Sequence, residues 1–141
     1  SRSTARWSVL AGEGGLALSA ALVLAQQPAG PNSAAAGKGE TAYRRYCASC
    51  HGLTGRGDGS IAAELRTAPT DLTLISKRNG GRFPLDKVAR QTDGRESIRA
   101  HGTPDMPAWG EVFKKTRGTE ADTVEDAVMQ IAHYLWSIQV K

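Results

Sequence analysis

The sequence places two cysteines and a histidine within five residues, as CASCH at positions 47–51, and the chain has no other cysteine. If the stretch from Tyr43 to Cys50 is helical, Cys47 and Cys50 share one face, so both thiols point the same way. Cys-x-x-Cys-His is the attachment signature of c-type haem, in which two thiols form thioether bonds along one porphyrin edge. His51 directly follows and can bring a ring nitrogen to the iron. The motif therefore predicts haem c bound through Cys47 and Cys50, with His51 as an axial iron ligand.

Other uses of paired cysteines fit the sequence less well. A thioredoxin-type redox centre lies among alternating strands and helices, a pattern that this sequence does not show. A structural zinc site needs four Cys or His ligands, and His101 and His133 lack the usual paired spacing. We expect His133 on the polar, solvated side of the last helix. A disulfide between Cys47 and Cys50 would close a very short loop and stabilise little. Haem attachment is therefore the favoured interpretation.

A methionine is predicted to supply the second axial ligand. Met106 lies between Pro104 and Pro107, two prolines that restrict the backbone and would hold the thioether sulfur at a fixed point. A His/Met pair fills both axial positions of a haem iron and raises its reduction potential. His101, earlier in the same stretch, is the alternative ligand. The other methionine, Met129, is expected to fill the core beside the last helix.

Short helices are expected to position these residues. The clearest one carries an apolar stripe at helical spacing, formed by Val124, Ala127, Val128, Ile131, Leu135 and Ile138. A first helix is expected over about residues 38–50, with shorter helical segments at about 61–66, 70–78 and 84–94. Residues 95–110 are expected to form an ordered loop. The sequence therefore predicts an all-α domain.

Four glycines fall within residues 52–59, immediately after the CASCH motif. This run lacks both the Lys-Ser/Thr ending and the preceding strand of a phosphate-binding loop. Glycine permits positive φ and leaves little side-chain bulk. We therefore expect the run to let the chain pass closely along a haem edge.

The N-terminal residues resemble an export signal. Arg2 and Arg6 form a basic start, and an apolar run of about ten residues, too short to span a bilayer, ends at Ala25. We expect residues 1–25 to be a cleaved signal peptide, 26–37 a flexible lead-in and 38–141 the folded domain. A retained membrane anchor over residues 7–25 is the alternative, and it would have to bury Glu13. Export agrees with haem attachment outside the energy-transducing membrane and predicts a periplasmic protein.

Length and charge narrow the possible functions. A chain of 141 residues is long enough for one domain. It carries 18 Lys and Arg against 14 Asp and Glu, for a net charge of +4. This balance lacks the dense basic stripe of a nucleic-acid-binding protein. We expect no nucleic-acid partner.

From about Lys38 to Gln139, the chain resembles the class I c-type cytochromes, and more narrowly their bacterial periplasmic monohaem members and the haem subunits of dehydrogenases and oxidases. The matching positions are Gly39, Tyr43, Cys47, Cys50, His51, Met106-Pro107, Trp109-Gly110, Ile131, Tyr134 and Leu135. The resemblance implies the cytochrome c fold, in which several short helices are wrapped round one covalently attached haem. It also implies that the Pro69 carbonyl accepts a hydrogen bond from His51. The implied partners of the haem propionates are Trp109 and one of Arg78, Arg82, Arg95 and Arg99.

The function implied by the resemblance is one-electron transfer without catalysis. With both axial positions filled, no position is open for a substrate, and protein partners would dock briefly. These partners would be a donor dehydrogenase or cytochrome complex and an acceptor oxidase or reductase. Three basic groups would steer an acidic partner: Arg44-Arg45, Lys77-Arg78 and Lys114-Lys115-Arg117. One alternative is a permanent electron-transfer subunit of a larger dehydrogenase or oxidase. A remote one is a haem enzyme or gas sensor with an open distal site, which requires that Met106 does not bind iron.

Overall fold

The computed structural model describes residues 30–96, 106–115 and 123–141, and within these ranges it is helical and has no strand. The helices are α1 (Ser33–Tyr46), α2 (Ala48–His51), α3 (Ile75–Arg78), α4 (Leu85–Asp93), α5 (Trp109–Lys115) and α6 (Val124–Ser137). Two short 3-10 turns lie at Ala62–Glu64 and Leu72–Leu74. The predicted all-α class is confirmed. In the part of the chain that the structure describes, no helix has the length and apolar character needed to cross a membrane.

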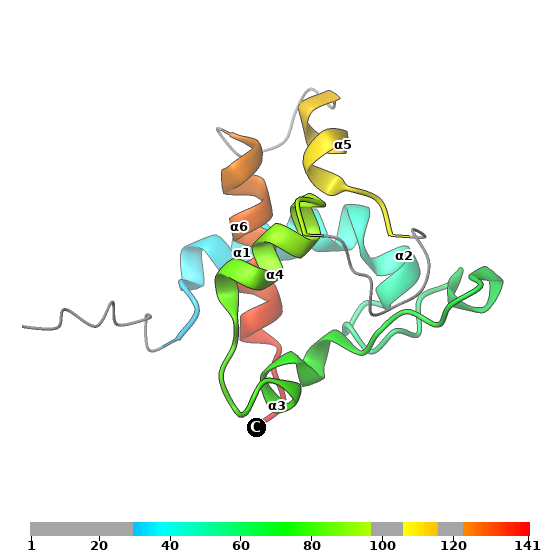
Figure 1. The fold of residues 1–141 in the computed structure, drawn as a ribbon, viewed down its shortest axis with the longest axis horizontal. Coiled ribbons are helices and arrows are strands. Elements are labelled where there is room, and N and C mark those ends of the chain that lie inside the picture. Colours follow the sequence, from blue (N-terminus) through cyan, green and yellow to red (C-terminus); the bar gives the residue numbers. More distant parts are fainter. Residues whose placement is uncertain (1–29, 97–105, 116–122) are drawn as a thin grey trace, which may run out of the picture.

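Helices α1 and α6 cross at the centre of the molecule (Figure 1). Most of the apolar stripe predicted for the last helix is buried there, with Ile131 only 1% exposed, and Val124 and Ile138 at its two ends are partly buried. Gly39 makes the close crossing possible, because a Cβ at this position would lie directly against the backbone of Gln130. Beside it, the fully buried ring of Tyr43 packs on Tyr134, with 5.0 Å between ring centroids. The crossing thus fixes the helix turn that precedes Cys47.

Helix α1 begins earlier than the sequence predicted. The side chain of Asn32 caps the helix by accepting a hydrogen bond of 2.9 Å from the Ala35 amide. Alanine-rich residues then favour helix from Ser33 onward, so residues 33–37 belong to α1 and not to a flexible lead-in. Residues 1–29, which contain the predicted signal peptide and the start of that lead-in, lie outside the described residues. The helix also breaks at Cys47, and α2 continues from Ala48 in a separate turn.

Helix α5 was not predicted, since residues 95–110 were expected to be a loop and no helix was expected over residues 111–115. Its two aromatic residues are one turn apart and pack on α1. Tyr46 contacts Trp109 at 5.6 Å and Phe113 at 5.1 Å between ring centroids. Two glycines bring α5 against the end of α4: a Cβ at Gly94 would meet Ala108, and one at Gly110 would meet Asp93. These contacts place the residues after Met106 beside α4.

Candidate functional site

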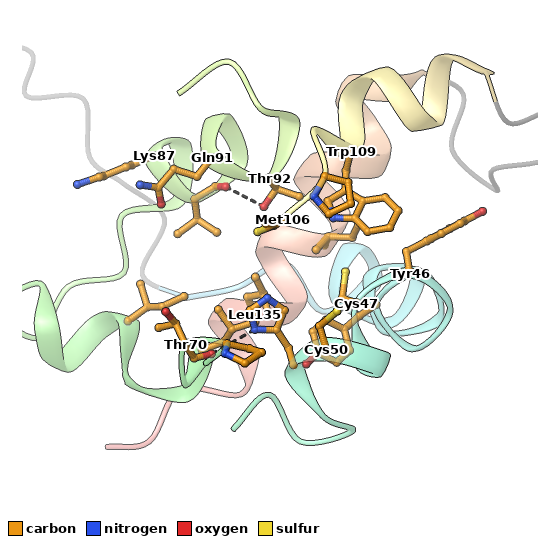
Figure 2. Close-up of a pocket in the computed structure, with 18 of the residues that line it drawn as sticks. Tyr46, Cys47, Cys50, Thr70, Lys87, Gln91, Thr92, Met106, Trp109 and Leu135 are labelled. Atoms are coloured by element: carbon orange, nitrogen blue, oxygen red, sulfur yellow. Dashed lines mark hydrogen bonds between the residues drawn. The ribbon is translucent and has the colours of Figure 1, made fainter. Parts of the chain in front are cut away.

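A cavity of about 480 Å³ lies among α2, α3, α4, α6 and the start of α5 (Figure 2). This volume is within the usual range for sites that enclose a small molecule or cofactor. Its walls are largely apolar and include Leu72, Ile75, Val88, Ile131 and Leu135. The cavity therefore offers a low-dielectric space bounded by residues from both halves of the chain.

Both cysteines lie at the same end of the cavity (Figure 2). Cys47 follows the last residue of α1, and the short turn of α2 brings Cys50 beside it. Burial, and to a lesser degree the neighbouring Cys50, raise the pKa of the Cys47 thiol to about 12. This thiol is therefore protonated at neutral pH, unlike the low-pKa thiolate of a thioredoxin-type centre.

The imidazole of His51 also lines the cavity. Its Nδ1 lies 3.2 Å from the carbonyl oxygen of Thr70, a contact drawn as a dashed line in Figure 2. A histidine that donates from Nδ1 to a carbonyl has its lone pair on Nε2, which is the arrangement found in metal-binding histidines. The side chain is thus prepared to offer Nε2 to a metal.

The acceptor at His51 differs from the one implied by the family resemblance. Pro69 lines the cavity, but the carbonyl beside the imidazole belongs to Thr70. The Pro69 carbonyl instead lies directly against Gly57, in the position that a Cβ of residue 57 would occupy. Packing against the glycine-rich run therefore moves the acceptor one residue along the chain.

The glycine-rich run itself lies behind the histidine and does not line the cavity. Gly57 donates a backbone hydrogen bond of 2.8 Å to the His51 carbonyl, and Gly59 donates one of 3.1 Å to that of Cys50. Gly52 and Gly57 have φ of 80° and 82°, so the expected need for positive φ is present. The close approaches of Gly57 and Gly59 are to the chain's own backbone, and the expectation that this run follows a haem edge stays a prediction.

Met106 enters the cavity from the side opposite Thr70 (Figure 2). Its side chain is half-buried, and Pro107 and Trp109 line the cavity beside it. A thioether and an imidazole thus reach one cavity from facing walls. The alternative ligand His101 and the candidate Arg99 lie outside the described residues.

The structure distinguishes among the remaining arginines that were candidate partners of the haem propionates. Arg78 lines the cavity, whereas Arg82 and Arg95 do not, and Arg95 instead pairs with Asp93. Sequence reasoning missed Lys87 and Gln91, which are one helical turn apart on α4 and both line the cavity. Figure 2 shows these two side chains at the end away from the cysteines. Their spacing placed them on one face of α4, but nothing in the sequence indicated what that face would border.

The residues present fit a c-type haem. The macrocycle carries its vinyl-derived carbons on one edge and its two carboxylates on the opposite edge. Likewise, the cavity has two thiols at one end, Lys87 at the end away from them, Arg78 in its lining from α3, and largely apolar walls. His51 and Met106 supply nitrogen and sulfur, which suit haem iron as axial ligands. The donor set therefore matches the group that the CASCH motif predicts.

Comparisons with known proteins agree with this geometry. The family model described as "Cytochrome C oxidase, cbb3-type, subunit III" matches residues 34–135, which include the cavity. No curated protein matches the chain. A chain of the reducing HAO-like protein complex of Kuenenia stuttgartiensis is similar in structure, with a TM-score of 0.56 and 24% sequence identity. The match covers 81% of this chain but 48% of that one, so the present chain spans about half the length of its structural relative. At this identity, the likeness shows the fold alone.

Proposed function

We propose a function from one premise: the chain belongs to the cytochrome c family of the cbb3-type oxidase subunit III, whose members carry covalently bound haem c. The domain is thus a monohaem c-type cytochrome that carries electrons, either alone or within a complex. In our proposal, Cys47 and Cys50 form the thioether bonds, and His51 and Met106 are the axial ligands. When bound, the haem supplies an iron that gains or loses one electron.

The observation that carries the proposal is the meeting of these four side chains in one largely apolar cavity. They come from positions as far apart as 47 and 106, so their meeting is a product of the fold and not of local sequence. The Thr70 carbonyl orients the imidazole of His51. Apolar walls exclude water, and two protein ligands leave no iron position for a substrate. These features suit electron transfer and not substrate turnover.

Replacing Met106 with Ala tests the proposed ligand set. We expect the ferric protein to lose its far-red sulfur-to-iron charge-transfer band and the ferrous protein to bind carbon monoxide, because one axial position opens. Met129→Ala is the matched control, since Met129 packs partly buried against the core and does not line the cavity. If the band survives in Met106→Ala, Met106 is not the ligand. If the unmodified ferrous protein binds carbon monoxide readily, the open-site enzyme or sensor gains support instead.

A second candidate role is that of a permanent electron-transfer subunit. The family is described as an oxidase subunit, and the similar solved chain is part of a protein complex. Two of the basic groups expected to steer a transient partner have a member already paired within the chain. Arg44 bonds Glu40 at 2.9 Å, and Lys114 bonds Glu111 at 2.6 Å. Size-exclusion chromatography of native extract separates the roles, because a permanent subunit co-elutes with a catalytic partner and a free carrier does not.

We also propose that the protein is exported to the periplasm, with residues 1–25 as a cleaved signal peptide. The support is the sequence pattern of that segment and the need of c-type haem attachment for an exported chain. N-terminal sequencing of the mature protein should then find a start near Gln26. An intact N-terminal segment in membrane fractions would instead indicate an anchor over residues 7–25.

A further inference from the structure

The segment from Thr70 to Arg78 borders the cavity and also holds the proposed iron ligand. Thr70 supplies the carbonyl that lies 3.2 Å from Nδ1 of His51. At the other end of the segment, Arg78 lines the cavity from α3. A short piece of chain therefore connects the hydrogen bond of the histidine to a cation at the cavity rim.

Asp71, which follows Thr70, is held in two separate ways. Its carboxylate caps the turn at residues 72–74, accepting bonds of 2.8 Å from the Thr73 amide and 2.6 Å from the Thr73 hydroxyl. This capping lowers the pKa of Asp71, so the carboxylate stays ionised and in place at neutral pH. Its backbone carbonyl accepts a bond of 2.6 Å from the guanidinium of Arg78. The peptide next to the Thr70 carbonyl is thus held by the side chain of Arg78.

The guanidinium has donors left over after this bond, because arginine carries several N–H groups in a fixed planar fork. A cofactor carboxylate within reach of Arg78 can accept from the remaining donors, with the charge assistance that strengthens such bonds. Arg78 would then donate hydrogen bonds both to a carboxylate of the cofactor and to the Asp71 carbonyl.

We propose that Arg78 is a positioning residue that couples the carboxylate edge of the haem to the hydrogen bond between His51 and Thr70. This inference rests on the proposed function, in which His51 binds the iron. Because the partner of Nδ1 determines how strongly a coordinating imidazole donates to its metal, the coupling lets a contact at the cavity rim affect the iron.

Lys87 provides the matched control. It lines the same cavity from α4, is exposed as Arg78 is, and no hydrogen bond connects it to residues 70–78. Loss of either charge should lower the reduction potential, because a nearby cation disfavours the more positive ferric state. Loss of Arg78 alone should also release the Asp71 carbonyl. A comparison of variants at the two positions therefore separates the effect of a lost charge from the effect of a lost hydrogen bond to Asp71.

The segment has other attachments that should keep it folded without Arg78. The side-chain amide of Gln139 donates to the Leu72 carbonyl and accepts from the Ser76 amide, each at 2.8 Å. The Leu72 amide donates to the Gly55 carbonyl at 2.7 Å. The amide protons of Leu72 and Ser76 therefore report whether the segment remains in place.

The test measures, by NMR on the reduced holoprotein, the rate at which the Nδ1 proton of His51 exchanges with solvent. In Arg78→Gln we expect this rate to rise about tenfold, a factor of the size expected for one weakened hydrogen bond. In Lys87→Gln the rate should stay within about twofold of the wild-type rate. In both variants, exchange at the Leu72 and Ser76 amides should remain at the wild-type rate.

Each other outcome has a defined meaning. Equal acceleration in both variants, or acceleration in neither, overturns the coupling while leaving His51 as the ligand. Faster exchange at Leu72 and Ser76 in Arg78→Gln also overturns it, since Arg78 would then stabilise the whole segment and not one peptide. If the wild-type protein shows no iron-bound His51 signal, the proposed function itself fails, and the coupling fails with it.

Discussion

The two walls that face each other across the cavity are built in different ways. The His51 wall is held mainly by backbone hydrogen bonds. The carbonyls of Ser49, Cys50 and His51 accept from Ile61, Gly59 and Gly57, and the His51 imidazole meets the Thr70 carbonyl. Each of these bonds joins the motif to a segment that folds back over it. The wall is therefore fixed around the proposed iron ligand, His51, itself.

The Met106 wall depends on side-chain packing. Met106 and Pro107 make no backbone hydrogen bond to the described residues, and the first ones on this side come from Glu111 and Val112 to the Ala108 carbonyl. The wall is positioned instead by the aromatic contacts of α5 with Tyr46 and by the close approach of α5 to the end of α4. The proposed ligand Met106 is thus positioned indirectly, through the helix that follows it.

This contrast predicts that the two axial bonds fail in different ways. Backbone hydrogen bonds hold atoms in a narrow range of positions, whereas packed aromatic rings can shift when a neighbour is removed. The Met106 sulfur should therefore be the first ligand to leave the iron when the protein is stressed. His51 should remain bound until the glycine-rich run is disturbed.

Phe113→Ala should have the largest effect, and it should act on the Met106 wall. Phe113 is 4% exposed and packs on Tyr46 and Trp109, so its removal leaves a cavity and should cost about 3 to 5 kcal/mol of unfolding free energy. We also expect the ferric sulfur-to-iron band to weaken or disappear in the folded protein. Denaturant unfolding gives the first quantity and the optical spectrum the second.

Phe83→Ala is the matched control. Phe83 is equally buried, at 4% exposure, but stacks on Trp136 of α6, away from α5. It should lose similar stability and keep the band. If both variants lose the band, general destabilisation and not the packing of α5 controls the methionine bond.

Gly57→Ala should have the next largest effect, and it should act on the His51 wall. Alanine at this position would have to adopt a positive φ of 82°, and its Cβ would clash with the Pro69 carbonyl. We therefore expect a loss of about 2 kcal/mol or more of unfolding free energy. The control is Gly80→Ala, where φ is also positive but no atom lies within 4 Å of the added Cβ. That variant should lose only about 1 kcal/mol. Equal losses would mean that backbone strain alone matters and that the contact between Gly57 and Pro69 is unimportant.

The sequence predicted those parts of the site that depend on local patterns. The spacing of Cys47 and Cys50 can be read within one turn of helix, and the apolar stripe that includes Ile131 within a single helix of about four turns. Pro84 before α4 and the left-handed Gly94 at its end are likewise local signals, and the structure confirms both as helix limits.

The parts that the sequence did not predict depend on contacts between distant segments. The acceptor for His51 is decided by how Gly57 packs against Pro69, and α5 is stabilised by Tyr46 from another helix. In the sequence, Lys87 looks like any exposed lysine of an amphipathic helix, and only the structure shows that it lines the cavity. Such features follow from tertiary packing, which neither periodicity nor motif spacing encodes.

The smallest predicted effect lies away from both walls, at the start of α1. His133, expected to be solvated, is half-buried, and its Nδ1 accepts a hydrogen bond of 3.1 Å from the Asn32 amide, which requires a neutral ring. Burial lowers the pKa of His133 below its ordinary value of 6.5. As the pH falls through 6.5, the unfolded chain therefore takes up a proton before the folded one, and stability that is complete above this pH is progressively lost.

Because the ring is only partly buried, we expect a change of only a fraction of a kcal/mol between about pH 7.5 and about pH 5.5. Denaturant unfolding of His133→Gln measures it, because glutamine keeps an acceptor and does not titrate. Carboxylates elsewhere titrate in both proteins, so the difference between the two pH profiles isolates His133. This acid sensitivity should leave the optical bands of both axial ligands unchanged, since the Asn32 contact lies at the far end of α1 from Cys47. A band that fades in the wild type and not in His133→Gln would mean that the start of α1 supports the cavity walls after all.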